Sequence, residues 1–501
     1  MQKQLDDLKI TLAEISDIQR AAGLLGWDQE TYMPPGGAEA RAEQLATLSK
    51  LAHQKFIADE LGLLLEALTP WAKTLDPDSD DAALVRVIAR DYEKARKLPT
   101  KLVGDLSRAT SKAVEAWKVA RAENDFSRFE PHLQAVLALT IQKAQTYGYD
   151  EHIYDALLDD YEPEMKSSQV AAIFKQVQQA TTPLVEAIVA HADAVDDSMM
   201  HQYFDPQKQW DFGVEVIKDF GFDLTNGRQD KSTHPFTASF SAKDVRLTTR
   251  IMDNFFPSSL SSTMHEAGHG LYEQGIDYAL NRSGLDDGAS LGIHESQSRM
   301  WENVVGRSKE FWAHYFPRAQ ELFPEQLKGV SLTDFYKAIN KSQPSLIRVE
   351  ADEVTYNLHI FVRFELERLL VSGQLEVADL PEAWNERMKS YLGLVPDSDA
   401  NGVMQDIHWS SGLIGYFPTY ALGNILSVQF YNRMLGEHPD IPTQIEKGDF
   451  SHILSWLRRN IHRHGRKYAP PQLIQRVTGG PLNAQPYIDY ITAKYSEIYE
   501  L

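Results

Sequence analysis

The sequence predicts a large, mainly α-helical protein with a small antiparallel β-sheet. Apolar residues recur at helical spacing along most of the chain, and only one short region near residue 233 is rich in β-branched and aromatic residues. The 501 residues, 43% hydrophobic and 24% charged, are sufficient for a large core. Because no low-complexity linker or internal repeat interrupts the chain, we expect one unit spanning residues 1–501, with two lobes around a cleft.

Helical periodicity predicts five helices before residue 233. Apolar residues from Leu5 to Ile18 indicate an opening amphipathic helix, and Pro34–Gly37 predicts the turn after it. The same spacing predicts helices at Ala38–Leu51, Leu102–Ala122, Phe129–Tyr147 and Val170–Ala194.

Two segments in the middle of the chain are typical of strands. Thr233–Phe240 and Val245–Arg250 are rich in β-branched and aromatic residues, and their short separation favours an antiparallel pair. Helical patterning then resumes and continues to the C-terminus, with loops such as Pro396–Gly402.

Charge and composition exclude several classes of protein. The net charge of −21 disfavours nucleic-acid binding, which usually needs a basic face. No apolar run reaches the roughly eighteen residues of a membrane span, and the N-terminus lacks the pattern of a signal peptide. With no cysteines, disulfides and cysteine-ligated metals are excluded. We therefore expect a cytoplasmic protein.

The segment Thr263–Gly270 carries the strongest chemical signal. It contains His265-Glu266-Ala267-Gly268-His269 in a region that looks helical. Histidines four residues apart share one helix face, so both can bind one zinc ion, and Glu266 is close enough to act on a water that the zinc activates. Because the chain has 16 histidines, such a pair can also arise by chance as ordinary surface or capping groups.

A catalytic zinc usually takes a third protein ligand. Glu273, on the same helix, would lie roughly 12 Å along the axis from His265, too far to converge on one ion. The metzincin continuation needs Gly and then His after the second histidine, but those positions hold Tyr272 and Gly275.

The next candidates lie in Gly292–Ser298, at the start of a helix predicted to run through Val305. The intervening loop, Asn281–Gly288, lets the two helices pack side by side. Glu295 can then reach the ion, whereas its rival His294 points about 100° away on the same helix. Since most helix glutamates are solvated, position alone favours Glu295 only slightly.

Five motifs occur in order along the chain. They are Asp244-Val245-Arg246-Leu247-Thr248, His265-Glu266-Ala267-Gly268-His269, His294-Glu295-Ser296-Gln297, Ile347-Arg348-Val349-Glu350-Ala351 and Gly402-Val403-Met404-Gln405-Asp406-Ile407-His408-Trp409. With Leu25–Thr31 and the length of the chain, they make the sequence resemble the carboxypeptidase Taq family of zinc metallocarboxypeptidases. The resemblance covers essentially the whole chain, and no metal or catalytic position departs from it.

This resemblance implies a helical peptidase fold similar to neurolysin and angiotensin-converting enzyme, with zinc at the floor of a groove between two lobes. It implies His265, His269 and Glu295 as zinc ligands, although Co²⁺ or Mn²⁺ also suit these ligand types. It also implies a homodimer that releases single C-terminal residues from peptides, with broad specificity and poor activity on C-terminal proline.

Catalytic roles follow from the same resemblance. Glu266 would act as general base, and Tyr420, by analogy with related helical peptidases, would donate to the oxyanion, with Tyr416 as the alternative. His408 would donate to the substrate or intermediate. Each of these three rings can instead be a packed core residue; His408 stands beside Trp409.

A carboxypeptidase must also recognise a terminal carboxylate, for which the planar fork of arginine is best suited. Arg348 is the leading candidate and Arg246 the second, with Gln405 lining the same subsite. The alternative for Arg348 is an ordinary ion pair with Glu350 or Asp352.

The predicted strands offer a site for the peptide backbone. An exposed edge beside the zinc helix can bind a peptide as an added strand, which would explain broad tolerance of side chains; alternatively, the sheet only braces the groove. The competing functions are an oligoendopeptidase or dipeptidyl carboxypeptidase of similar fold, and a non-catalytic helical binding protein.

Overall fold

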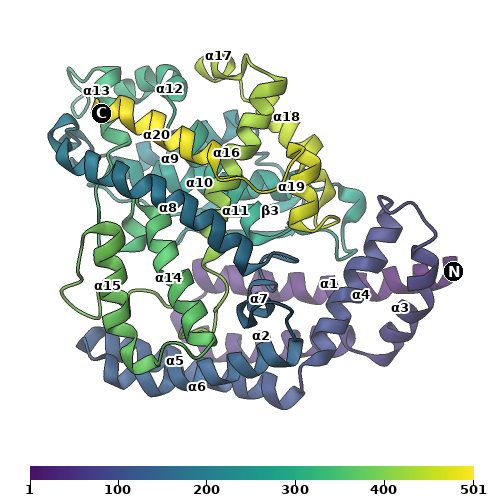
Figure 1. Ribbon diagram of the computed structural model, residues 1–501. Helices are drawn as coiled ribbons and strands as arrows, with labels where there is room; N and C mark the ends of the chain where they lie inside the picture. The colour runs from purple at the N-terminus through teal and green to yellow at the C-terminus, as the bar shows by residue number, and fades with distance from the viewer.

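The computed structural model describes residues 1–501 as a mainly helical chain with one three-stranded sheet (Figure 1). The first seven helices are α1 (Gln2–Thr31), α2 (Ala38–Phe56), α3 (Asp59–Ala72), α4 (Asp80–Lys97), α5 (Thr100–Glu123), α6 (Phe126–Tyr147) and α7 (Ile153–Leu158). The middle of the chain forms α8 (Ser167–Ala190), α9 (Pro206–Asp219), β1 (Gly227–Lys231), β2 (Thr237–Ser241), β3 (Asp244–Thr249), α10 (Phe256–Gly275) and α11 (Leu291–Arg299). The C-terminal helices are α12 (Lys309–Leu322), α13 (Leu332–Ile339), α14 (Tyr356–Val371), α15 (Leu380–Leu392), α16 (Pro418–Glu437), α17 (Ile441–Glu446), α18 (Ser451–Asn460), α19 (Pro470–Thr478) and α20 (Gln485–Tyr499).

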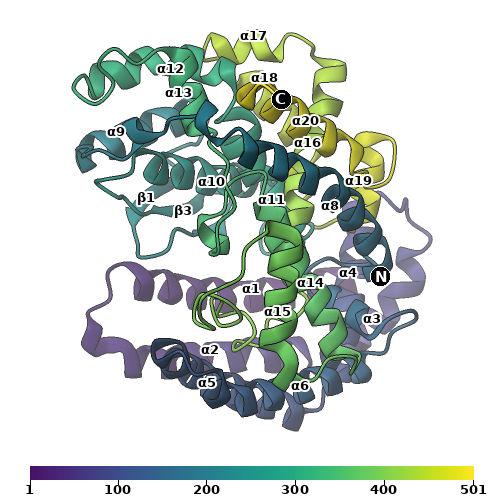
Figure 2. The same ribbon diagram turned by 60° about the vertical axis from the view of Figure 1, so that its left-hand side comes forward.

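The helices form two groups on either side of the sheet. In both ribbon views α1, α2, α5 and α6 lie together below the sheet, while most helices from α8 onward lie on its other side (Figures 1 and 2). One continuous cluster of buried apolar residues extends from Leu5 to Tyr499 and joins the two groups. The more specific expectations of two lobes and of similarity to neurolysin stay predictions.

All five helices predicted before residue 233 are present. The prediction for α8 was too long: the helix ends at Ala190, and a short 3₁₀ turn follows at Ala192–Ala194. Local chemistry sets such limits. For example, the Asp125 side chain accepts the Ser127 N–H and caps the start of α6, and Gly148 ends that helix with a φ of 80°, which glycine tolerates best.

The sheet is mixed, with the strand order β1-β3-β2. The predicted antiparallel pair is confirmed, since β2 and β3 run antiparallel with Thr237 opposite Leu247. However, β1 was not predicted and runs parallel to β3. Its sequence, Gly-Arg-Gln-Asp-Lys, has no apolar residue to reveal a strand, because β1 lies at the edge of the sheet.

Two glycines let α10 approach its neighbours closely. A Cβ on Gly270 would lie 2.7 Å from Leu247 Cδ2 of β3, and one on Gly268 would lie 2.5 Å from Ser298 Cα of α11. Both separations are too short for a methyl group. The predicted side-by-side packing of the two helices is therefore confirmed, and glycine makes it possible.

Two features of α11 position its side chains. The single helix predicted through Val305 changes form at Met300, where a π-helical segment, Met300–Val305, follows directly. A π-turn adds a residue to the turn and changes which side chains face a neighbour, and such turns are frequent at functional sites. On its other side α11 packs against α16, where a Cβ on Gly423 would lie 2.3 Å from Glu295 Cγ.

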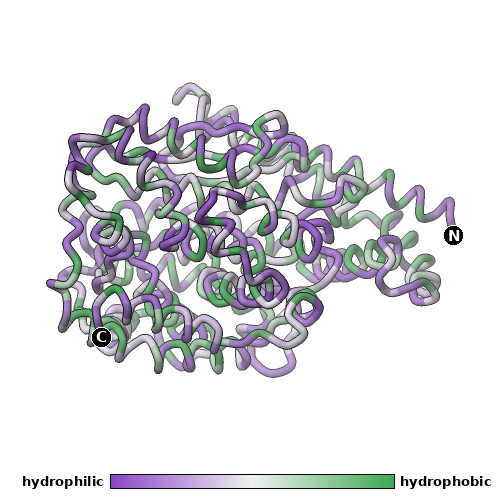
Figure 3. Tube along the Cα trace, turned by 90° about the horizontal axis from the view of Figure 1, so that it is seen from above, coloured by the Kyte–Doolittle hydropathy of each residue, from purple (hydrophilic) through white to green (hydrophobic).

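Hydrophobic and hydrophilic residues alternate along most helices, as amphipathic packing around a core requires (Figure 3). The region around the N-terminus extends from one side of the body in this view. No helix combines the length and the apolarity needed to cross a bilayer.

A buried carboxyl group at the start of α11 gives the first testable prediction. Glu162 accepts the Gly292 N–H, and burial raises its pKa to about 8. The native state therefore retains a proton that the unfolded state releases near pH 4.5, so the stabilising contribution is complete below that pH and is lost as pH rises towards 8.

We expect Glu162→Gln, which cannot ionise, to flatten the fall in melting temperature between pH 5 and 8. Thermal unfolding across this range measures the effect, with the exposed Glu382→Gln as control. Parallel pH profiles for the unaltered protein and Glu162→Gln would contradict the assignment.

Candidate metal centre

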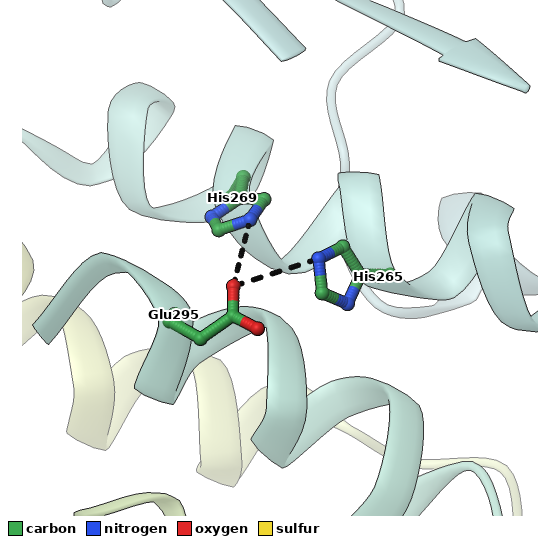
Figure 4. A group of neighbouring side chains, drawn as sticks. All are labelled: His265, His269 and Glu295. Atoms are coloured by element: carbon green, nitrogen blue, oxygen red, sulfur yellow. Dashed lines mark ion pairs between the residues drawn. The ribbon is translucent and has the colours of Figure 1, made fainter. Parts of the chain in front are cut away.

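Three side chains from α10 and α11 converge at one point. Glu295 Oε2 lies 3.6 Å from His265 Nε2 and 3.5 Å from His269 Nε2 (Figure 4). Tetrahedral ligands at about 2.1 Å from a zinc ion lie about 3.4 Å apart, so these atoms suit a small divalent cation. The structure thus brings the predicted trio together and makes it a candidate metal site.

The rejected candidate, Glu273, lies elsewhere. Its carboxylate pairs with His294 Nε2 at 2.8 Å, and the other ring nitrogen of His294 faces His269 Nδ1 at 2.6 Å. His294 therefore lies behind a candidate ligand, and the position facing both α10 histidines belongs to Glu295.

An arginine and a second carboxylate surround the trio. Arg299 donates to Glu295 Oε1 at 2.7 Å and to Glu302 Oε2 at 3.2 Å. Glu302 Oε2 in turn lies 2.9 Å from His265 Nδ1. Arg299 and Glu302 therefore form a hydrogen-bonded group that supports two of the candidate ligands, Glu295 and His265.

These charges set the protonation of the site. Although burial alone would raise the pKa of Glu295, Arg299 and the two histidines hold it well below its usual range. Burial lowers the pKa of His269 to about 4, whereas for His265 the nearby Glu295 and Glu302 outweigh burial and raise the pKa. An ionised carboxylate and a neutral His269 are the states that bind a metal.

Glu266 is buried beside the trio and is held by the sheet. Thr237 Oγ1 of β2 donates to Glu266 Oε2 at 2.6 Å. Burial raises the pKa of Glu266 above its ordinary value. The edge strand β2 thus orients this carboxylate, while its expected role in binding substrate stays a prediction.

A cavity of about 770 Å³ opens at the site. His265 and Glu266 line it, and so do five cationic residues: Arg250, Arg299, Arg307, Lys341 and Arg348. Most of these cations are paired, Lys341 for instance with Asp197 at 2.8 Å. By contrast, Arg250 has no carboxylate partner, and Arg307 lies 3.6 Å from Glu302 with its buried Nε unbonded.

Arg348 lines this cavity and also forms a buried ion pair. The partner is Asp406 rather than the nearby Glu350 or Asp352: Arg348 Nε and Nη2 both bond Asp406 Oδ1, at 3.0 and 2.8 Å. Nη1 donates to Tyr356 Oη at 2.9 Å. Of the five N–H groups of this guanidinium, two remain free.

The other two predicted carboxylate-binding residues are already engaged. The Gln405 oxygen accepts from the Arg348 backbone and from Arg363, while its amide group donates to two backbone carbonyls. Arg246 pairs with Asp244 and lies over Trp27, 4.4 Å from the ring centroid. Neither residue lines the cavity.

The predicted ring residues lie together but outside the cavity lining. His408 Nε2 is 3.2 Å from Tyr420 Oη, and the Tyr416 and Tyr420 ring centroids are 5.3 Å apart. Burial lowers the pKa of His408 to about 4 and raises the pKa of both tyrosines. The histidine is thus neutral at pH 7, and both phenols keep their protons.

Sequence reasoning missed four residues of this site: Thr237, Arg299, Glu302 and Asp406. A signal existed for two of them, because Arg299 and Glu302 follow Glu295 at roughly one-turn intervals on the same predicted helix. Asp406 stands in the fifth motif between Gln405 and His408, but its pairing with Arg348 has no signal in the sequence, and neither has the contact of Thr237 with Glu266, since these partners come from distant segments.

The chain resembles known proteins over nearly its whole length. The chain matches the family described as Carboxypeptidase Taq (M32) metallopeptidase over residues 7–495. Thermostable carboxypeptidase 1 of Thermus thermophilus is 42% identical over 498 residues, covering 97% of each chain. Carboxypeptidase 1 of Bacillus subtilis is 39% identical over 500 residues, covering 100% of this chain and 99% of the relative. The crystal structure of M32 carboxypeptidase from Deinococcus radiodurans matches with a TM-score of 0.97 at 41% identity, covering 100% of both chains.

The contact between Gly423 and Glu295 gives a prediction about the site. A methyl group at Gly423 must displace Glu295, so Gly423→Ala should destabilise the protein by about 1–3 kcal/mol and weaken Zn²⁺ binding about tenfold or more. Gly436, exposed on the same helix with nothing within 4 Å of its Cβ position, is the matched control.

Gly436→Ala should bind zinc normally and be slightly more stable, because alanine favours helix. Thermal unfolding and chelator competition measure both quantities. Equal zinc affinity in the two variants would mean that the α11–α16 contact does not hold the ligand.

Proposed function

The chain belongs to the carboxypeptidase Taq (M32) family of metallopeptidases, and on this basis we propose a zinc-dependent carboxypeptidase that removes single residues from the C-terminus of peptides. Metallocarboxypeptidase activity follows from the family and its named relatives. The convergence of His265, His269 and Glu295, with Glu266 beside them, carries the zinc chemistry. Broad specificity, poor activity on C-terminal proline, a homodimer and a cytoplasmic location are further parts of the proposal.

In this proposal His265, His269 and Glu295 hold the metal. A divalent ion held by these residues would supply activation of a water molecule and polarisation of the scissile carbonyl. Two nitrogen ligands and one oxygen ligand favour zinc, while Co²⁺ and Mn²⁺ are acceptable substitutes. Arg299 supports the role of Glu295 as a ligand, because it keeps that carboxylate ionised and fixes one of its oxygens.

Glu266 acts as the general base. It takes a proton from the attacking water and passes it to the leaving amine. The Thr237 hydroxyl holds one carboxylate oxygen and leaves the other for the water. The raised pKa of Glu266 suits this double role, because a carboxyl with a higher pKa accepts the proton more readily.

Tyr420 donates its hydroxyl to the developing oxyanion, with Tyr416 as the alternative. His408 lies within hydrogen-bonding distance of the Tyr420 hydroxyl, so it can orient that donor or reach the substrate itself. The raised pKa of both tyrosines supports these roles, since each phenol keeps the proton that it must donate.

Arg348 is the leading candidate for binding the terminal carboxylate. The ion pair with Asp406 fixes its plane and leaves two N–H groups for a substrate. Gln405 acts through Arg348, because it accepts the Arg348 backbone N–H. Arg246 is a weaker candidate than Arg348, since it does not line the cavity. Arg250 and Arg307 are further candidates, because they line the cavity and neither has a hydrogen-bonded carboxylate.

The main rival is an endopeptidase or dipeptidyl carboxypeptidase that uses the same chemistry at another bond. A digest of an N-terminally blocked peptide, followed by mass analysis, separates the three. We expect successive losses of one residue from the C-terminus, abolished by a chelator and restored by Zn²⁺. Dipeptide release or internal cuts would refute the proposal.

Glu266→Gln is the matching active-site test. It should lower kcat about 10²- to 10⁴-fold while binding one zinc per chain with unchanged melting temperature. If the protein is a non-catalytic binding protein, its function should not differ between the unaltered protein and Glu266→Gln. A Glu266→Gln variant that retains peptidase activity would contradict the mechanism.

Recognition of the terminal carboxylate can be tested with paired substrates. The free-acid peptide should be cleaved faster than its C-terminal amide, and Arg348→Gln should reduce this preference about tenfold or more through loss of a charged hydrogen bond. Arg250→Gln and Arg307→Gln test the alternatives, and Lys341→Gln, which removes a cation paired with Asp197, is the control. If the preference for the free acid is retained in Arg348→Gln but lost in Arg250→Gln or Arg307→Gln, the terminal carboxylate binds to that other arginine.

A further inference from the structure

The two candidate histidine ligands have different partners behind them. His265 Nδ1 contacts a carboxylate directly, at 2.9 Å from Glu302 Oε2. In contrast, His269 Nδ1 faces another imidazole, at 2.6 Å from His294 Nδ1. The carboxylate on this side, Glu273, lies one ring further out, 2.8 Å from His294 Nε2. No role assigned above accounts for this His269–His294–Glu273 chain.

If His269 binds a metal, the hydrogen bonds of the His269–His294–Glu273 chain fix where its protons lie. Two nitrogens 2.6 Å apart share a single proton, so one ring donates and the other accepts. His269 Nε2 faces Glu295 and must present a lone pair if it is to bind a metal. His269 Nδ1 then carries the proton, and His294 Nδ1 must accept it.

The other end of His294 agrees with this arrangement. A neutral imidazole that accepts at Nδ1 carries its proton on Nε2. This nitrogen faces the Glu273 carboxylate, whose Oε1 can accept the hydrogen bond. Glu273 is itself buried on α10, two turns beyond His265. Each hydrogen bond of the chain therefore has one donor and one acceptor when His269 serves as a ligand.

Packing against Tyr272 and Gly288 restricts the orientation of the His294 ring. Its centroid lies 4.9 Å from that of the Tyr272 ring, which the Ala289 N–H anchors through a 3.1 Å hydrogen bond to the hydroxyl. A Cβ on Gly288 would lie only 2.7 Å from His294 Cδ2 and 3.3 Å from Tyr272 Cε1, so this glycine lies close to both rings. The ring thus occupies a slot between α10 and the loop before α11.

We propose that His294 is a positioning residue that fixes the tautomer and ring orientation of His269, with Glu273 as its anchor. The proposal rests on the ligand role of His269 in the proposed function. Groups of this kind raise metal affinity because the ligand nitrogen is already aimed at the ion and does not lose orientational freedom on binding. Placing an imidazole between His269 and Glu273 also keeps the Glu273 carboxylate one ring away from a site that already contains Glu266, Glu295 and Glu302.

The first test compares two substitutions of His294. His294→Phe keeps a flat ring but provides no acceptor, whereas His294→Gln provides an acceptor for His269 and a donor for Glu273. Zinc affinity, measured by chelator competition, should fall about 10- to 100-fold in His294→Phe and recover to within a few fold in His294→Gln. His53→Phe, at an exposed histidine of α2, is the matched control and should bind zinc normally.

The melting temperature of the metal-free proteins distinguishes positioning from general damage. We expect His294→Phe to lose affinity far beyond any change in metal-free stability. The proposal fails if His294→Phe binds zinc as tightly as the unaltered protein, or if both His294 variants lose affinity in proportion to lost stability.

The histidine tautomers can be measured by NMR spectroscopy on the unaltered protein, so this test does not depend on the folding of a variant. In the zinc-loaded protein labelled with ¹⁵N-histidine, His269 should carry its proton on Nδ1 and His294 on Nε2. A proton on Nδ1 of His294 would overturn the proposal. His269→Ala separates this failure from that of the proposed function: undiminished zinc affinity in His269→Ala would show that His269 is not a ligand at all.

Discussion

The close approach of three helices at glycine residues determines the geometry of the site. Gly268 brings the backbone of α11 against α10, and Gly423 brings α16 against Glu295 itself. Since no side chain can enter either contact, Glu295 is confined between the two histidines of α10 on one side and α16 on the other. The candidate ligands are thus positioned by backbone packing, which is far more rigid than the side chains themselves.

This packing forces several charges into the protein interior. Glu266, Glu295 and Glu302 are all buried, as is the carboxylate of Glu273. Buried charge is costly unless it is paired, and Arg299 pairs with two of these carboxylates. A divalent cation between His265, His269 and Glu295 would supply further compensation, so the same electrostatics that favour metal binding also favour the folded, loaded state.

In the proposed function, recognition of the substrate depends on a different part of the chain. The cationic residues that line the cavity come mainly from the segment after β3, the end of α11 and the loop before α14. Asp406 forms ion pairs with two arginines in this region, Arg348 and Arg363. The candidate metal ligands and Glu266 therefore lie on α10 and α11, whereas the residues that we propose to select a chain end lie mainly on loops around them. This division explains why the strongest motif predicts a metal but does not predict which peptide bond is cleaved.

The sequence by itself determined the features that depend on local periodicity. Helical spacing predicted α1, α2, α5, α6 and α8, and the four-residue spacing of His265 and His269 placed both on one face of α10. Spacing also excluded Glu273, and indeed this carboxylate lies against His294. Tertiary structure decided what spacing left open: Glu295 rather than His294 faces the pair, Arg348 pairs with Asp406, 58 residues away, and polar β1 joins the sheet. The reason is that helical and strand periodicity depend on neighbours along the chain, whereas these three outcomes depend on contacts between segments that only the packed core brings together.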